Sequence, residues 1–458
     1  MNPSLPACWL ETVRLHGRKV ALIEASTGTR CTFQQLNDRA DAWARDHGAS
    51  IPPGLEGRSV AFSVPNGIRW FELMLGLLKL GAIPVPLDAA EPVDSQKNLV
   101  KLLRSVARWE NDRLVPVQHG SGGAKRHRTT RPCLIKLTSG STGSPRPLLF
   151  SHDEMIADAR QVMSSMGITS EDRNHALIPF GHSYGLGNLT LPLMIAGVSV
   201  VCGTSPFPHA IAADLRQWKS TVFPAVPAIL RALAGADGIR LGRLRLIISA
   251  GAPLPVETAG AFRQRYGRSI HSFYGSSETG GISFDRDGRA TLEGSVGTAM
   301  DGVTLTRLGT DRLRVSSPAV FTAGNRRKHN RHGAWVMADR VRIGADRTIR
   351  LLGRRGTTVK IAGRRVELAE IAAAIKRLPG VDDAWVAVGG TDEQVIGAAV
   401  ASGRSSSELR DALGRILSAW KIPRKWLVLP ALPQTERGKP DSRALNSALF
   451  GPASPRSS

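Results

Sequence analysis

The chain has 458 residues, 42% of them hydrophobic, so it can bury more than one hydrophobic core and is not a disordered protein. Lys and Arg outnumber Asp and Glu by 61 to 38, and the resulting charge of +23 favours acidic partners: nucleotides, coenzyme A, an acidic carrier protein, nucleic acid or a membrane surface. The charge equally fits a protein that uses arginine on its solvated surface.

The chain shows no sign of export or membrane insertion. Its N-terminus lacks a basic start followed by an apolar run, so we expect no signal peptide and a cytoplasmic protein. The most apolar long stretch, residues 70–87, contains Glu72 and Lys79, which favours a buried helix and strand over a membrane span. The cysteines are too widely spaced for a metal site or a disulfide framework: Cys8, Cys31, Cys133 and Cys202.

The first third of the chain alternates helix-like and strand-like segments. Residues 32–44 repeat apolar side chains at helical spacing behind Thr32, a good N-cap, and residues 59–64 read as a strand. Residues 71–81 predict a helix that ends at a glycine, and residues 94–113 predict a surface helix. This alternation indicates a layered α/β fold.

The pattern changes further along the chain. Short strands over residues 294–320 predict a small β-rich layer, and residues 349–380 predict two strands followed by a helix from about 367 to 378. Strands are expected at 382–389 and 395–402 and a helix at 405–419.

A loop rich in Gly and Ser, LTSGSTGSPRP at residues 137–147, lies between apolar runs of strand type. Its glycines and hydroxyls describe a phosphate cradle, and they equally describe a flexible surface loop. The spacing of a Walker loop fails from both Gly140 and Gly143, so a bound phosphate here would not indicate a P-loop NTPase.

Six motifs in order carry a resemblance that none carries alone. LTSGSTGSPRP is followed by SAGAPL (249–254), YGSSETG (274–280), AWVMAD (334–339), GRRGTTVKIAGRRVELAEI (353–371) and LPQTERGKPDSRAL (432–445). Together they resemble the adenylate-forming superfamily, which includes acyl- and aryl-CoA synthetases, the adenylation domains of peptide synthetases, and luciferase. The resemblance covers nearly the whole chain.

The resemblance implies a fold and a two-step reaction. A large N-terminal AMP-binding α/β domain (1–353) would be followed by a small mobile α+β lid domain (354–447) and a disordered tail (448–458). A carboxylic acid, aryl or fatty, would first attack ATP to give an acyl-adenylate and pyrophosphate. The thiol of coenzyme A or of a carrier-protein phosphopantetheine would then displace AMP and form a thioester. Positioning and positive charge would supply most of the catalysis.

The resemblance also implies which residues hold the nucleotide. Thr138, Ser139, Gly140, Ser141, Thr142 and Gly143 would cradle the β- and γ-phosphates, with Thr138 among the catalytic residues. Arg146 stands where the family usually has lysine, and either cation can meet phosphate. Glu278 matches the glutamate that binds Mg²⁺, an ion that prefers oxygen ligands. Gly251, Ala252, Pro253, Tyr274, Gly275, Ser276 and Ser277 would complete the adenine and α-phosphate contacts.

Two further residues would bind the ribose. Asp339 matches the aspartate that accepts hydrogen bonds from its hydroxyls, although the preceding Thr-Gly of the family is here Met337-Ala338. Arg354 matches the arginine that contacts ribose and phosphate. A solvated surface arginine is the alternative for Arg354 in so basic a chain.

The C-terminal motifs imply the remaining machinery. Lys439, in QTERGKPDSR, matches the lysine that meets the α-phosphate and the carboxylate in the first step. Gly356 replaces the usual aspartate of the hinge, and a glycine can absorb a large backbone rotation. Gly363 matches the glycine that lets pantetheine approach, and it could equally be a turn between two strands.

The acid pocket is expected around GHSYGLGN, residues 181–188, where a helix should begin. His182 takes the place of the family's pocket histidine or aromatic residue. Tyr184, Gly185 and Asn188 belong to a run seen in benzoate-type CoA ligases. A histidine among apolar residues is also a common core group. No aspartate stands in this segment to hold an amino group, so an amino acid is the less favoured substrate.

Two other classes of function stay open. A non-catalytic or adenylation-only binding protein of the same fold would explain the altered hinge, Met337-Ala338 and Arg146. Nucleic-acid binding would draw on the basic runs at 122–132 and 325–332, but neither carries the aromatic residues that stack on bases, so no nucleic-acid partner is expected.

Overall fold

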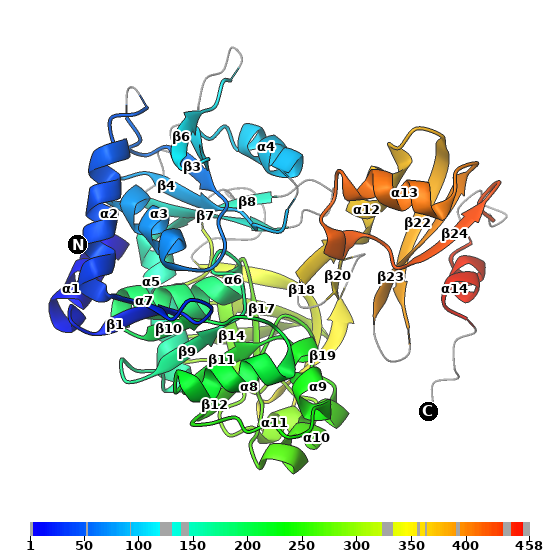
Figure 1. Cartoon of the computed structure of the whole chain (residues 1–458). Coiled ribbons are helices and arrows are strands. Elements are labelled where there is room, and N and C mark those ends of the chain that lie inside the picture. Colours follow the sequence, from blue (N-terminus) through cyan, green and yellow to red (C-terminus); the bar gives the residue numbers. More distant parts are fainter. Residues whose placement is uncertain are drawn as a thin grey trace. The chain divides into compact units, whose positions relative to one another are not determined.

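A computed structural model of the whole chain shows the arrangement of its elements (Figure 1). The structure describes residues 3–51, 54–91, 93–119, 131–138, 146–322, 333–354, 358–361, 364–390, 394–433 and 441–451. It divides into two compact units. The second unit comprises residues 356–458 together with residues 90–99 and 138–146, and the first comprises the rest. The domain limits expected from the sequence stay predictions.

The first unit is built on a largely parallel sheet. Its strands are β1 (Val20–Glu24), β2 (Thr29–Thr32), β9 (Arg173–Ala176), β10 (Ser199–Cys202), β11 (Val222–Ala225), β12 (Leu246–Ser249), β13 (His271–Ser276), β14 (Gly280–Phe284) and β15 (Thr298–Ala299). Among the described residues the order is β15-β14-β13-β12-β11-β9-β10-β1-β2. The pairs from β13 across to β1 are parallel, and the outer strands at both edges pair antiparallel.

Helices cover both faces of this sheet (Figure 1). They are α1 (Leu5–His16), α2 (Phe33–His47), α3 (Ile68–Lys79), α5 (His152–Met166), α7 (Leu191–Ala196), α8 (Pro208–Gln217), α9 (Pro227–Gly235), α10 (Val256–Tyr266) and the short α11 (Arg289–Leu292). Side chains of α8, α9 and α10 share one buried cluster with β11 and β12. Side chains of α1, α2, α3, α5 and α7 share another. The layered α/β fold expected from the sequence is thereby confirmed.

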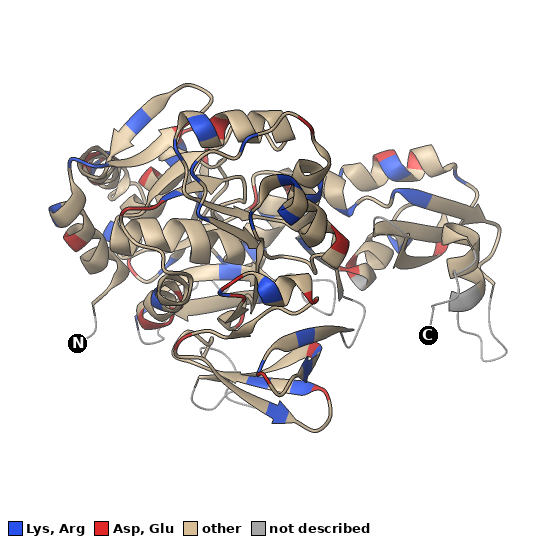
Figure 2. Ribbon diagram, turned by 90° about the horizontal axis from the view of Figure 1, so that it is seen from below, with Lys and Arg blue, Asp and Glu red and all other residues tan. Residues whose placement is uncertain are grey.

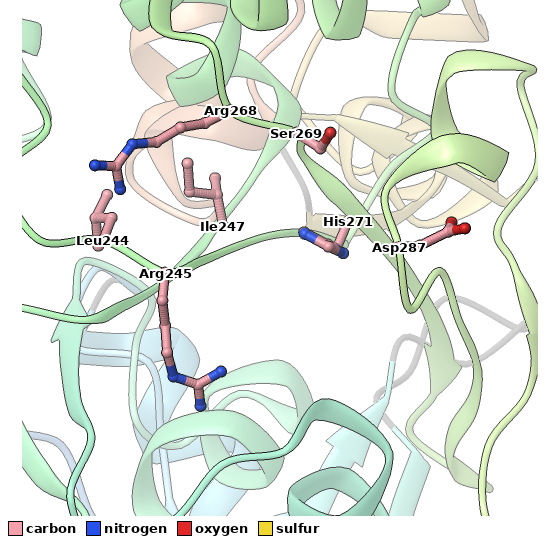
Figure 3. Close-up of a pocket in the computed structure, with 7 residues that line it drawn as sticks. All are labelled: Leu244, Arg245, Ile247, Arg268, Ser269, His271 and Asp287. Atoms are coloured by element: carbon pink, nitrogen blue, oxygen red, sulfur yellow. The ribbon is translucent and has the colours of Figure 1, made fainter.

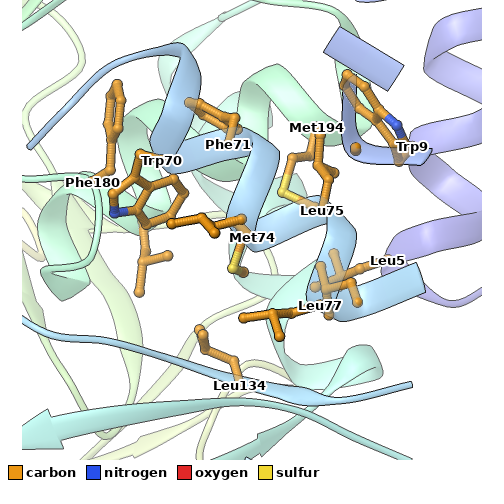
Figure 4. Packing of buried hydrophobic residues seen from close by; sticks show 14 of the residues in the cluster. Leu5, Trp9, Trp70, Phe71, Met74, Leu75, Leu77, Leu134, Phe180 and Met194 are labelled. Carbon is orange, nitrogen blue, oxygen red and sulfur yellow. The ribbon is translucent and has the colours of Figure 1, made fainter. Parts of the chain in front are cut away.

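The apolar stretch from residue 70 lies in the second of these clusters (Figure 4). The ring of Trp70 on α3 packs edge-on against three phenylalanine rings, at centroid distances of 5.5 Å to Phe62, 5.2 Å to Phe71 and 5.3 Å to Phe180. The strand β4 (Ile83–Pro86) follows, so the prediction of a buried helix and strand is confirmed. No helix in the described part of the chain has both the length and the apolar character to cross a membrane.

One predicted helix is largely wrong. Only α4 (Val93–Leu102) is helical within residues 94–113, and the hairpin of β5 (Ala107–Glu110) and β6 (Arg113–Pro116) follows it. The two residues between the strands, Asn111 and Asp112, have φ of 48° and 55°. Such two-residue turns match the twist of a hairpin, and Asn and Asp tolerate their left-handed backbone. The hairpin extends a smaller sheet of order β4-β3-β5-β6, in which β3 is Ser59–Phe62.

The remaining elements of the first unit fit the sequence predictions. The strands β7 (Pro132–Thr138) and β8 (Arg146–Ser151) flank the Gly- and Ser-rich loop and pair with each other. The β-rich layer is an antiparallel sheet of β16 (Thr304–Leu308), β17 (Arg312–Ser316), β18 (Ala334–Ile343) and β19 (Ile349–Arg354).

The second unit is small and mixed. It contains the hairpin β20 (Thr358–Ile361) and β21 (Arg364–Glu367), the sheet of β22 (Val381–Gly389), β23 (Val395–Ser402) and β24 (Lys425–Leu429), and the helices α12 (Leu368–Lys376), α13 (Ser406–Gly414) and α14 (Ser442–Phe450). The helix expected over 405–419 is shorter than predicted. It ends at Gly414, and a separate 3₁₀ turn (Ala419–Lys421) follows.

Basic residues are spread over many elements. Figure 2 shows Lys and Arg on helices, strands and connecting segments, with Asp and Glu among them. Several arginines form surface ion pairs, such as Arg14 with Glu11 and Arg265 with Asp237. Much of the net charge is therefore carried by solvated surface positions. The basic runs at 122–132 and 325–332 lie mostly outside the described residues.

His175 on β9 gives the fold a pH dependence. Its side chain is fully buried, neither ring nitrogen has a hydrogen-bond partner among the described residues, and burial lowers its pKa from 6.5 to about 4. Between these values the unfolded chain binds the proton more readily. We therefore expect the free energy of unfolding to fall as the pH is lowered from about 6.5 to about 4, and urea titrations at several pH values would measure it.

The non-titrating variant His175→Gln should lose less stability over this pH range than the wild type, whatever its stability at pH 7. Part of the pH dependence of the unfolding free energy should persist in this variant, because burial also lowers the pKa of His152 to about 4. The exposed His209 on α8 provides the matched control: His209→Gln should follow the wild-type pH profile. A His175→Gln profile parallel to the wild type would contradict the prediction.

Candidate active site

Polar residues gather at one edge of the large sheet. In a parallel sheet the carboxyl ends of neighbouring strands lie at the same edge, which is where α/β proteins bind ligands. His182 and Ser183 follow β9, Gly251 follows β12, and Ser277 follows β13. The Ser183 hydroxyl donates to Ser277 Oγ at 2.8 Å, across 94 residues of sequence. The fold thus brings the predicted pocket segment and the YGSSETG motif into contact.

The YGSSETG motif forms a tight hairpin turn between β13 and β14. Ser276 Oγ accepts a hydrogen bond from the Glu278 N–H at 3.3 Å and lies 3.1 Å from Thr279 Oγ1. The carbonyl of Glu278 accepts from the Phe321 N–H at 2.8 Å. The backbone of Glu278 is therefore held from both sides, directly beyond the carboxyl end of β13.

Gly280 closes this turn and tolerates no side chain. Its φ is +69°, and a Cβ atom there would lie 2.2 Å from Asp158 Oδ1. The same Asp158 oxygen accepts a hydrogen bond from the Gly281 N–H at 3.0 Å. Gly280 and Gly281 thus allow the turn to pack directly against the buried carboxylate of Asp158 on α5.

A hydrogen bond joins the predicted adenine and ribose residues. The buried Tyr274 on β13 donates its hydroxyl to Asp339 Oδ2 on β18 at 2.8 Å. The neighbouring strands pair Asp339 with Arg354, whose side chain lies outside the described residues. The SAGAPL turn follows β12 at the same edge, and Gly251 there has φ of +91°. Ala252 is partly exposed and Pro253 is exposed.

Only the flanks of the Gly- and Ser-rich loop are described. Thr138 ends β7, and its hydroxyl donates to the Arg146 carbonyl at 3.4 Å, a long contact. Ser139, Gly140, Ser141, Thr142, Gly143, Gly356, Gly363 and Lys439 lie outside the described residues. Their roles stay predictions.

The pocket segment folds into one helical run of α6 (Ser183–Gly185), a π-helical turn (Leu186–Thr190) and α7. The Tyr184 hydroxyl reaches the carbonyls of Ala225 at 3.4 Å and Ile248 at 3.2 Å, and burial raises its pKa. Gly185 is a packing requirement, because a Cβ there would lie 2.0 Å from the Pro179 carbonyl oxygen. Tyr184 therefore attaches the pocket segment to β11 and β12, and Gly185 lets it pack closely against Pro179.

The π-helical turn is braced by two buried asparagines. Asn174 of β9 donates its side-chain amide to the Asn188 carbonyl at 2.7 Å, and Asn188 donates its own to the Tyr184 carbonyl at 3.3 Å. The side-chain oxygens of both asparagines have no hydrogen-bond partner among the described residues. Single π-turns are frequent at functional sites.

His182 opens the run and meets an aspartate that the sequence analysis missed. Its Nε2 lies 3.1 Å from Asp88 Oδ2. Asp88 follows β4, in the IPVPLD segment about ninety residues earlier. The two strands that carry these residues belong to different sheets, so sequence spacing offered no signal.

A second set of residues was also missed: the buried charges under the Glu278 turn. Lys136 on β7 and Glu154 and Asp158 on α5 are 3%, 5% and 3% exposed. A lysine within the apolar run CLIKL was the available signal, because unpaired lysines are almost never fully buried.

The cavity of Figure 3 lies elsewhere. It measures about 340 Å³ and is lined by Leu244, Arg245, Ile247, Arg268, Ser269, His271 and Asp287. These residues surround the starts of β12 and β13, at the amino edge of the sheet. Its two arginines already donate hydrogen bonds, Arg245 to Asp172 and Arg268 to the Gly242 carbonyl. The predicted site residues are therefore not part of this cavity.

Comparison with known families identifies the family of this chain. The AMP-binding enzyme family matches residues 9–107 and 101–318, and the AMP-binding enzyme C-terminal domain matches residues 370–439. The chain belongs to the AMP-binding enzyme family, within the adenylate-forming superfamily. The family match spans the SAGAPL and YGSSETG motifs and confirms the resemblance deduced from the sequence.

Similar proteins of this family include several CoA ligases. A probable CoA ligase of Humulus lupulus is 24% identical, over 96% of this chain and 92% of its own. A feruloyl-CoA synthase of Amycolatopsis is 25% identical, over 90% and 92%. The amide bond synthetase of Marinactinospora thermotolerans has the same fold, with a TM-score of 0.84, 20% identity and coverage of 98% and 100%.

Gly280→Ala should destabilise the protein by more than about 2 kcal/mol, since it combines backbone strain with a clash against Asp158. Gly267 is the matched control. Its φ is +64°, but no atom lies within 4 Å of a Cβ there, so Gly267→Ala should cost only about 1 kcal/mol. Urea unfolding of both variants would measure the difference, and equal losses would contradict the close packing of the turn.

Proposed function

We propose that the protein is an AMP-forming acid–thiol ligase. It activates an aryl or fatty carboxylic acid with ATP and transfers the acyl group to a thiol, either that of coenzyme A or that of a carrier-protein phosphopantetheine. The observation that carries the proposal is the Tyr274–Asp339 hydrogen bond beside the Ser183–Ser277 contact. In the first contact a residue that the resemblance assigns to adenine meets one assigned to ribose, and in the second the acid-pocket segment meets a residue assigned to the α-phosphate.

The first step joins two anions, so the protein must position them and offset their charge. The acid's carboxylate oxygen attacks the α-phosphorus of ATP, and the bond to the pyrophosphate oxygen breaks. We assign the ribose hydroxyls to Asp339, whose carboxylate already accepts a hydrogen bond from Tyr274. We assign the α-phosphate to Ser277 and Lys439, and the β- and γ-phosphates to residues 138–143 with Arg146.

The residues at the edge fit a magnesium ion held jointly with ATP. Glu278 offers carboxylate oxygens on a turn whose backbone is fixed at both its N–H and its carbonyl. Mg²⁺ in nucleotide enzymes is usually bound by one or two carboxylates together with substrate phosphates. When bound, the ion would offset phosphate charge, and the role of Glu278 is to orient it.

The second step needs a thiol. The sulfur attacks the acyl carbon of the adenylate, the bond to the AMP oxygen breaks, and a thioester forms. The CoA ligases among the relatives support coenzyme A as the acceptor. A carrier protein stays an option, because an adenylation domain fused to a carrier domain is among the similar folds, with a TM-score of 0.79.

The acid pocket is assigned to the segment from His182 to Asn188. The segment begins at His182, which lies beside Asp88, and this polar pair can orient a carboxylic acid or a ring substituent. Relatives named for feruloyl and 4-hydroxybenzoate substrates support an aryl acid, and one named for OPC-8:0 supports a longer aliphatic chain.

Pyrophosphate release from Mg-ATP with a panel of acids tests the proposal. The panel contains short and long fatty acids, benzoates and cinnamates, each with and without coenzyme A. We expect release with one class of acid and a thioester once coenzyme A is added. Release without thioester would favour a carrier-protein acceptor or an adenylation-only protein. ATP binding without release from any acid would favour the non-catalytic alternative.

Lys439→Ala should lower the rate of pyrophosphate release by roughly a thousandfold or more. The reason is that we assign this lysine to the negative charge that develops at the α-phosphate in the first step. Lys101→Ala, at an exposed position of α4, serves as the control and should keep wild-type activity. The unfolding midpoints of both variants should match the wild type. Near-normal release by folded Lys439→Ala would remove this residue from the mechanism.

A further inference from the structure

A buried lysine lies beneath the candidate site. Lys136 is on β7, two residues before Thr138, and is 3% exposed. Its Nζ lies 4.2 Å from the centroid of the Phe150 ring. Within the described residues it has neither a hydrogen-bond partner nor an ion-pair partner within 4.0 Å. Burying an ammonium without close pairing costs free energy, so a hydrophobic residue would be the simpler occupant of this strand position.

The surroundings of Lys136 are acidic. Glu154 and Asp158 lie one turn apart on α5 and are both buried. Burial lowers the pKa of Lys136, and the charges of Asp158, Glu154 and Glu278 act in the opposite direction, together with the Cys133 thiol. Lys136 thus shares its electrostatic environment with the glutamate assigned to magnesium.

The two buried carboxylates hold two segments that adjoin Glu278: Gly281, three residues after it, and Thr322, next to the Phe321 that bonds to its carbonyl. Asp158 accepts from the Gly281 N–H at 3.0 Å. Glu154 Oε1 accepts from the Thr322 N–H at 2.9 Å and from its hydroxyl at 2.6 Å. Thr322 follows Phe321, whose N–H donates to the Glu278 carbonyl. Asp158 and Glu154 are both carboxylates, so they put negative charge close to a site that we propose for a polyphosphate.

Two aromatic rings connect Lys136 to the segment that contacts Glu278. Its ammonium lies over Phe150, and the Phe150 ring packs against that of Phe321 at 5.3 Å between centroids. Both phenylalanines are buried. A cation placed in this way feels the attraction of the ring face as well as that of the carboxylates.

We propose that Lys136 is a positioning residue for the nucleotide, a fixed buried cation that offsets the carboxylates of Glu154, Asp158 and Glu278 so that the site accepts ATP. The proposal rests on the proposed function, because it takes ATP as the ligand. It assigns Lys136 no contact with ATP. Lys136 acts through the Glu278 turn and through the positive electrostatic potential of its own ammonium group.

Lys136→Met keeps the length and apolar body of the side chain and removes its charge. We expect the dissociation constant for Mg-ATP, measured by calorimetry without any acid, to rise about tenfold, because the site loses a positive charge that offsets its carboxylates without touching ATP. The KM for ATP should rise in parallel, while kcat at saturating ATP changes less. The unfolding midpoint should stay the same or increase, because an apolar side chain often replaces a buried charge without loss of stability.

Lys79→Met is the matched control. Lys79 on α3 is partly buried, but it is hydrogen-bonded to Asn37 and Asp41. This variant should bind ATP as the wild type does. Lys136→Arg restores the charge and should recover most of the lost ATP affinity, even where the larger guanidinium lowers the unfolding midpoint.

Three outcomes would overturn the proposal. One is unchanged ATP affinity in folded Lys136→Met. Another is lower stability with unchanged affinity, which would make Lys136 a structural counter-ion only. The last is an Arg variant that folds but binds ATP no better than the Met variant. Should Lys136→Met fail to fold, Lys136→Gln takes its place under the same criteria. Wild-type protein that binds ATP but activates no acid would defeat the proposed function and leave this test intact.

Discussion

The parallel hydrogen bonding of β9, β11, β12 and β13 is the constraint on which the candidate site depends. It places the segments after these strands at one edge of the sheet, so Ser183 and Ser277 come into contact although 94 residues separate them. The carboxyl ends of parallel strands expose backbone groups that no neighbouring strand uses, and ligands bind there in other α/β folds.

Hydrogen bonds tie the YGSSETG segment at this edge to three other parts of the first unit. Tyr274 links β13 to β18, Phe321 fixes the Glu278 carbonyl, and Asp158 of α5 holds the end of the YGSSETG turn. Rigid placement matters for a reaction that joins a carboxylate to a polyphosphate, because most of its catalysis comes from orientation and electrostatic stabilisation. Gly280 of the motif contributes to this placement, because a side chain there would clash with Asp158.

Charge plays two separate parts in this protein. Surface arginines carry most of the positive charge, and many are exposed or paired with neighbouring carboxylates. Buried charges are different in kind, and three of them, Lys136, Glu154 and Asp158, interact electrostatically with one another close to the YGSSETG turn. A buried charge costs more than a surface charge and interacts more strongly. The composition of the chain therefore says little about the electrostatics of the site itself.

The sequence by itself determined the fold class, the family and the order of the motifs. Helical and strand periodicity identified most elements, such as α2, α3, β12 and the β-rich layer, because local spacing reflects which face of an element is buried. It failed at residues 103–113, where a two-residue Asn-Asp turn makes a hairpin instead of a helix. Only the tertiary structure decided that Tyr274 bonds to Asp339, that Asp88 meets His182 and that Lys136 is buried over the ring of Phe150. Such contacts join residues from different strands and sheets, and no local pattern encodes which distant side chain will face another.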